Sequence, residues 1–246
     1  MNLFSSADVF GVFWAGFFGE CISLRDHPVF MYGTLLVLIE YTLFAAICIG
    51  GGFKPPQNIS ICGYLEILPD RFAFLYFHVA SSGIDSTLWH AVKVFKLEQH
   101  FLLSAVQVAL NIGCAATLTG FSIFPRCLWD LHQACVLAWV CLTSAAMIVT
   151  FVRDFRKFDF SLIPSAFWTL SITFCCIFYS ESTWRFFFSE ALSVMSYISW
   201  CSSVHRQHSR IFSIFHVIII DGFLALFIFG LFRFHQQVAC SVSAKW

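Results

Sequence analysis

The chain has 246 residues, of which 59% are hydrophobic and only 11% are charged, with 14 basic and 14 acidic side chains. A water-soluble domain needs about a quarter of its residues charged, so the composition excludes a soluble globule. A net charge of zero excludes the basic face of a nucleic-acid binder, and we expect no nucleic-acid partner. The composition therefore predicts an integral membrane protein surrounded by membrane lipids.

The first 28 residues contain one apolar stretch, VFGVFWAGFF, which is too short to span a bilayer. No basic segment precedes it, so it is a poor signal peptide. We predict an interfacial or disordered segment over residues 1–28.

Seven longer apolar runs follow, and each approaches the roughly 20 residues that a spanning helix needs. The breaks between them carry Gly, Pro and charged residues. The runs are Val29–Ile49, Phe72–Val92, Phe101–Phe124, Leu131–Val152, Leu162–Tyr179, Phe186–Cys201 and Ile211–Phe232. This pattern predicts an all-α fold, a polytopic transmembrane helical bundle.

Orientation is predicted from the loops. With a cytosolic N-terminus, the cytosolic loops carry eight Lys and Arg residues and the lumenal loops carry six. The sequon that begins at Asn58 would then face the lumen, where a glycan can be added. Cys62 and Cys127 also fall in lumenal loops, where a disulfide between them can form, although the sequence does not pair them. We expect an N-terminus in the cytosol and a glycan on Asn58.

Polar side chains interrupt several of the apolar runs. Inserting an ionisable side chain at the bilayer centre costs about 2.5–3.5 kcal/mol of free energy, so each such residue is expected to have a structural or functional role. His78 and Asp85 are two helical turns apart and share a face of the second run. Gln107 and Asn111 share a face of the third run, and His132 lies at the start of the fourth.

Two interpretations compete for these residues. In the first, the polar groups pair between helices and hold the bundle together. In the second, His78, Asp85 and His132 line a polar cleft that opens to the lumen, where a neutral histidine takes a proton from a hydroxyl and a carboxylate orients it. Packing or snorkelling is the expected role of four further groups, Glu40, Glu190, His216 and Asp221.

Sequence signatures of soluble enzymes are absent. The chain has no GxSxG, no glycine-rich phosphate loop and no HExxH. Its cysteines and histidines do not follow metal-ligand spacing. We therefore expect no cofactor and no metal.

Several local features occur in a familiar order between about Val29 and His208. The first loop reads PPQNISICGY, and Pro69 and Arg71 lead into a run that contains His78 and ends near Trp89-His90. The fourth run begins Leu131-His132-Gln133-Ala134, after an asparagine in the third, and a basic loop follows it. This order resembles the family of post-GPI-attachment-to-proteins factor 2, within the wider group that includes the damage-regulated autophagy modulators.

The resemblance implies a six-span family bundle over residues 29–208, with residues 209–246 forming an extra C-terminal span and a short tail. It also implies a Golgi or endoplasmic reticulum membrane protein that acts on the GPI-anchor lipid. In that pathway a saturated acyl chain is placed on lyso-GPI, and the chain could be the acyltransferase. In that reading, His78 and His132 are base candidates, Asp85 orients a base, and Arg71 contacts phosphate. The remaining lipid-binding candidates are Trp89, His90, Gln107 and Asn111.

Two alternatives stay open. The first is a non-enzymatic scaffold of the autophagy-modulator type at the lysosome or plasma membrane, which would act through the basic loop with Arg153, Arg156 and Lys157. The second, a seven-helix receptor, rests on the number of spans alone, because the chain lacks a DRY-like triplet and an NPxxY motif.

Overall fold

The computed structural model describes residues 28–53, 56, 59–97, 101–154, 162–181, 183–205 and 217–243. In that part the chain is all-helical, with eight α-helices and no strand. The helices are α2 (Pro28–Gly50), α3 (Ile61–Ile67), α4 (Asp70–Leu97), α5 (Phe101–Ile123), α6 (Trp129–Asp154), α7 (Leu162–Phe178), α8 (Trp184–His205) and α10 (Gly222–Ser243). Four of the predictions above concern residues that lie outside the described ranges. These are residues 1–27, Asn58, the basic loop at 155–161 and His216.

Three of the helical segments are long and apolar enough to cross a membrane, namely Leu102–Ile123, Arg126–Val152 and Val217–Val238. Two shorter apolar helices, Leu35–Gly50 and Ile163–Phe178, lie beside them. These helices indicate a membrane protein.

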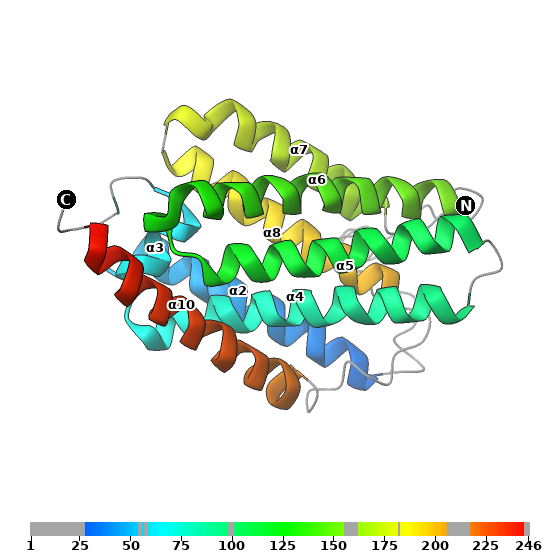
Figure 1. Ribbon diagram of the computed structural model, residues 1–246, viewed down its shortest axis with the longest axis horizontal. Helices are drawn as coiled ribbons and strands as arrows, with labels where there is room; N and C mark the ends of the chain where they lie inside the picture. Colours follow the sequence, from blue (N-terminus) through cyan, green and yellow to red (C-terminus); the bar gives the residue numbers. More distant parts are fainter. Residues whose placement is uncertain are drawn as a thin grey trace, which may run out of the picture.

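Helix α4 is more polar than its neighbours because it lies inside the bundle. It packs against α2, α5, α8 and α10 (Figure 1). Its Ser81, Ser82 and Thr87 side chains are buried. The outer surface is apolar instead, as on α10, where Phe223 and Phe227 are exposed. Polar groups inside and apolar groups outside are what a bilayer demands.

The long helices alternate in direction, so each connection lies at one of two ends of the bundle. One end, called here the α3 end, holds α3, the 3₁₀ turn η1 (Arg126–Leu128), the α7–α8 connection and the last turn of α10 (Figure 1). The first residue of α2 lies at the opposite end.

Two elements differ from the sequence-based expectation. The predicted first loop contains α3, because the Ser60 hydroxyl caps it by accepting a bond from the Gly63 amide at 3.1 Å. The last helix ends at Ser243 rather than at Phe232. Arg233, one residue beyond the predicted run, pairs with Asp70 at the start of α4 at 2.5 Å.

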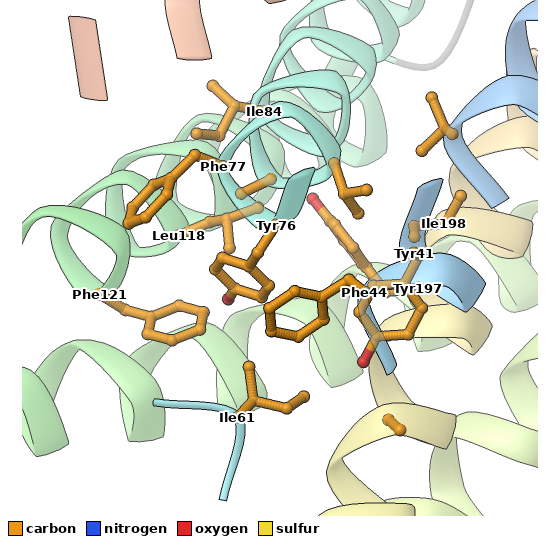
Figure 2. Packing of buried hydrophobic residues seen from close by; sticks show 14 of the residues in the cluster. Tyr41, Phe44, Ile61, Tyr76, Phe77, Ile84, Leu118, Phe121, Tyr197 and Ile198 are labelled. Carbon is orange, nitrogen blue, oxygen red and sulfur yellow. The ribbon is translucent and has the colours of Figure 1, made fainter. Parts of the chain in front are cut away.

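The bundle core is aromatic (Figure 2). The Tyr76 ring lies 5.5 Å from Phe44 of α2 and 6.4 Å from Phe121 of α5, measured between ring centroids. Tyr197 of α8 approaches from the other side and contacts Trp139 of α6 at 5.2 Å. These rings fix the rotation of α4, and that rotation decides where its polar side chains point.

Candidate functional site

His78 lies at the centre of a buried polar network. Its Nδ1 is 2.5 Å from the Glu40 Oε2 of α2, and its Nε2 is 2.9 Å from the backbone carbonyl oxygen of Val217. The His78 side chain is 8% exposed and that of Glu40 is 18% exposed. The carboxylate that orients His78 is therefore Glu40 and not Asp85, as the sequence had suggested.

One helical turn further along α4, Ser82 extends this network. Its hydroxyl donates to Asp221 Oδ2 at 2.5 Å, and both residues are buried. Asp221 ends the π-helical turn η3 (Val217–Asp221) that precedes α10. Of the two roles expected of Asp221, packing or snorkelling, the structure shows packing, because its side chain is fully enclosed. The network joins α2, α4 and α10 through side chains that are far apart in the sequence.

His132 has a different environment in the first turn of α6. Its Nδ1 donates to the Phe124 carbonyl oxygen at 2.7 Å. Its ring makes a T-shaped contact with the Phe121 ring, with 5.6 Å between the ring centroids. A carbonyl oxygen only accepts, so Nδ1 carries the hydrogen and the neutral ring has its lone pair on Nε2. Among the described residues, Nε2 has no hydrogen-bond partner. His132 can thus accept a proton from a ligand.

The loop that orients His132 is braced by a carboxylate that sequence reasoning missed. Glu66 of α3 accepts a bond from the Arg126 amide at 2.8 Å, two residues after Phe124. Burial raises the pKa of the Glu66 carboxyl, against the opposing effects of the Arg126 amide bond and the Arg126 charge. The sequence offered one signal for the role of Glu66, which is the only acidic residue in the otherwise apolar segment ICGYLEI.

Helix α3 is itself held by Glu190 of α8, whose Oε2 accepts a bond from the Ile61 amide at 2.8 Å. This bond satisfies one of the unpaired amides at the helix N-terminus. The packing role expected of Glu190 agrees with this contact. Glu190, Glu66 and the Phe124 carbonyl therefore form a continuous support from α8 to His132.

The predicted cleft shared by His78, Asp85 and His132 is not formed. Tyr76 faces α5 and Phe121, and His78 is two residues further on, about 200° around the helix. His78 accordingly faces α2 and α10, whereas His132 faces the α5–α6 corner. Asp85 lies about 10 Å further along α4, away from the α3 end. The wrong prediction arose because the faces of helices α4 and α6 cannot be related to each other from sequence.

The predicted lipid-binding residues do not form one site either. Arg71 is at the α3 end, where its guanidinium stacks over the Phe72 ring at 4.7 Å. His90 is about 28 Å away along α4, buried against Trp200 with 6.2 Å between ring centroids, and its neighbour Trp89 is exposed. A single lipid headgroup cannot contact both ends.

Gln107 and Asn111 take part in helix packing. The Gln107 amide donates to Asn111 Oδ1 at 3.1 Å, and its carbonyl oxygen accepts a bond from the Thr150 hydroxyl of α6 at 3.2 Å. Both amide side chains are fully buried. This geometry fits the first interpretation of the sequence, in which polar groups pair between helices.

A small apolar cavity of about 20 Å³ lies between α4, α5, α6 and α8. That space accepts about one water-sized group. Its lining includes Tyr76, Gly83, Leu118, Phe121, Trp139 and Tyr197. Phe121 lines this cavity and also contacts the His132 ring.

The disulfide between Cys62 and Cys127 that the sequence allowed is not formed. Cys62 is a free thiol, and Cys127 in η1 is disulfide-bonded. No group of three or more metal-ligating side chains is assembled within the described ranges.

Comparison with known proteins found no family model, no curated protein and no solved structure that matches this chain.

Proposed function

We propose that this protein is a multi-pass membrane protein of the secretory pathway that takes part in fatty-acid remodelling of GPI anchors, with His132 as the general base of an acyl transfer to lyso-GPI. The family resemblance of the segment around Leu131-His132-Gln133-Ala134 motivates the pathway. The observation that carries the proposal is the fixed orientation of His132, with Nδ1 on Phe124 and Nε2 unused.

The chemistry needs one proton acceptor. His132 Nε2 takes the proton of the free glycerol hydroxyl as its oxygen attacks the carbonyl carbon of an acyl ester or thioester donor. The bond from that carbon to the donor's alcohol or thiol breaks, and the imidazolium returns the proton to this leaving group. The backbone carbonyl of Phe124 keeps the ring in the required tautomer.

The location of His132 supports a lumenal reaction. It lies about 5 Å, measured along the helix, from the start of α6 at the α3 end. The same end carries the disulfide-bonded Cys127. Disulfides persist in oxidising compartments such as the lumen of the endoplasmic reticulum. These features support a lumenal α3 end and a cytosolic N-terminus.

The test is the replacement of His132 with Ala and, separately, with Gln in cells that depend on this chain. Mass spectrometry of the anchor lipid on a GPI-anchored reporter should show loss of the saturated chain, with protein abundance and location unchanged. His90→Gln is the matched control, a buried histidine at the opposite end of the bundle. Normal anchor lipids in both His132 variants would remove His132 from the mechanism.

A non-enzymatic scaffold is the second candidate function. It is supported by the engagement of His78, Gln107 and Asn111 in contacts between or within helices rather than in an open cleft. Charge reversal at Arg153, Arg156 and Lys157 discriminates between the two. If that reversal abolishes function and the His132 variants do not, the scaffold is correct.

A further inference from the structure

The buried network of Glu40, His78, Ser82 and Asp221 is not used by the proposed acyl transfer. It brings two carboxylates and one imidazole from three helices into the bundle interior. Ionisable groups at such positions are costly and mark proton or ion sites in many membrane proteins. The π-helical turn η3 lies directly at this network, and π-helical turns occur frequently at functional sites.

The geometry fixes how many protons the pair of His78 and Glu40 holds. The Val217 carbonyl oxygen only accepts, so His78 Nε2 must carry a hydrogen. The 2.5 Å between His78 Nδ1 and Glu40 Oε2 requires a second hydrogen between these atoms. With that proton the pair has no net charge, on whichever of the two atoms the proton resides.

Without that proton, the pair would be unstable in this environment. The imidazole lone pair and the Glu40 carboxylate would face each other at contact distance. A net negative charge would then lie close to Asp221, whose carboxylate already accepts the Ser82 hydroxyl. Coulomb repulsion is strong where water is excluded. The proton therefore stabilises the docking of η3 and α10 on α2 and α4.

We propose that Glu40, His78, Ser82 and Asp221 form an intramembrane proton-binding site, in which one exchangeable proton shared by His78 and Glu40 holds the η3 turn against α2 and α4. When that proton is released, the remaining ring hydrogen moves from Nε2 to Nδ1, where it bonds the Glu40 carboxylate. Nε2 then no longer donates to Val217, and the start of α10 loosens. The site is independent of the proposed acyl transfer.

The charged groups around His78 are few. Glu40 faces it from α2 and Asp221 faces it from η3. Helix α5 has no charged residue. On α10, Arg233 pairs with Asp70, and His235 Nδ1 donates to the Leu231 carbonyl oxygen. On α8, Glu190 binds the Ile61 amide and Arg185 stacks over Phe178, so within the described helices neither is a partner of His78. Replacing Glu40 therefore removes the direct carboxylate partner of His78.

The test uses the full chain in lipid nanodiscs with ¹⁵N-labelled histidine. NMR of the ring nitrogens, with the His78 signals assigned by their loss in His78→Gln, should show hydrogens at both Nδ1 and Nε2 of the wild-type ring, or a shared hydrogen at Nδ1. Glu40→Gln should convert His78 to a neutral ring with hydrogen on Nε2 only. Glu190→Gln is the matched control, because Glu190 binds the Ile61 amide and not His78. It should leave the His78 signals unchanged.

Hydrogen exchange gives a second readout that does not depend on assigning the histidines. Amide exchange over residues 217–222, corrected for the intrinsic pH dependence, should rise about tenfold or more in the wild type at alkaline pH. Glu40→Gln should show no such alkaline rise, because its His78 keeps the hydrogen on Nε2 and the bond to Val217. Exchange should stay at the wild-type level in Glu190→Gln. A His78 spectrum that Glu40→Gln does not alter would overturn the proposal, as would wild-type exchange over residues 217–222 that does not rise at alkaline pH.

Discussion

At the scale of single residues, the partner of a side chain determines its chemistry. His78, in the third turn of α4, and His132, in the first turn of α6, are both buried histidines, yet their hydrogen bonds differ. His78 uses both ring nitrogens, on a carboxylate and a carbonyl. His132 uses only Nδ1 and keeps a lone pair on Nε2. Only the second arrangement leaves a base available to a ligand.

Glu66 gives a pH-dependent prediction at this scale. Burial raises the pKa of its carboxyl, so the folded protein binds that proton more tightly than the unfolded chain. Its contribution to stability is therefore greatest below the ordinary pKa of glutamate and falls as pH rises through the raised value. Glu66→Gln keeps the acceptor for the Arg126 amide and should be as stable as the wild type, or more stable, at neutral pH. Thermal unfolding in detergent should show this difference shrink in acid.

Glu66→Ala is the contrasting variant. It removes the acceptor and leaves the Arg126 amide unpaired, which costs about 1–3 kcal/mol. It should also reduce anchor remodelling, because the loop that carries the Phe124 carbonyl loses its support. If Ala and Gln at position 66 behave alike in stability and in remodelling, Glu66 does not brace this loop.

At the scale of helices, α5 and α6 approach closely because of two glycines on one face of α5. A Cβ on Gly113 would lie 3.0 Å from Leu142, and a Cβ on Gly120 would lie 2.8 Å from the Cys135 sulfur. Small residues allow such close packing in membranes, where dispersion contacts take over from the hydrophobic effect. The close approach also brings Phe124 to His132, because both flank the connection between these helices.

Gly120→Val should therefore separate α5 from α6 and cost about 1–3 kcal/mol through overpacking. Its matched control is Gly230→Ala on α10, where an added Cβ meets nothing within 4 Å. That control should be neutral or stabilising by up to about 1 kcal/mol through helix propensity. The melting temperatures of the two purified variants check both predictions. If Gly120→Val is as stable as Gly230→Ala, helices α5 and α6 accommodate the larger side chain without loss of stability.

The polar contact between the same helices is measured by a double-mutant cycle. Gln107→Leu and Thr150→Val each remove one side of the bond from Thr150 to Gln107. Interhelical hydrogen bonds in membranes contribute about 0.6 kcal/mol on average and about 1.7 kcal/mol at most. The coupling energy from chemical unfolding should fall in that range, and strictly additive costs would argue that the two helices pack without this bond.

At the scale of the whole molecule, alternating helix directions place the first residue of α2 and the last residue of α10 at opposite ends of the bundle. Helix α10 packs against α4 and α5, so the last apolar run is integrated into the bundle. The division of the chain at residue 208 and the N-terminal segment stay predictions.

This arrangement predicts the topology of the C-terminus. A glycosylation sequon appended after Trp246 should be modified in cells, as should the natural sequon at Asn58, because both follow helices that end at the α3 end. Asn58→Gln isolates the appended site, and gel mobility after deglycosylation reads the result. Modification of Asn58 without modification of the appended sequon would contradict a membrane-spanning α10.

The sequence alone determined the membrane class and the helices, because both depend on local properties. Each run of about 20 apolar residues overlaps a helix, although α3 was missed and the last helix ends further along the chain than predicted. The tertiary structure alone decided which polar side chains meet. Glu40 and His78 are 38 residues apart and Ser82 and Asp221 are 139 apart. Hydropathy predicts that buried polar groups have partners. Which partner each one has depends on the rotation of its helix, and aromatic packing in the core sets that rotation.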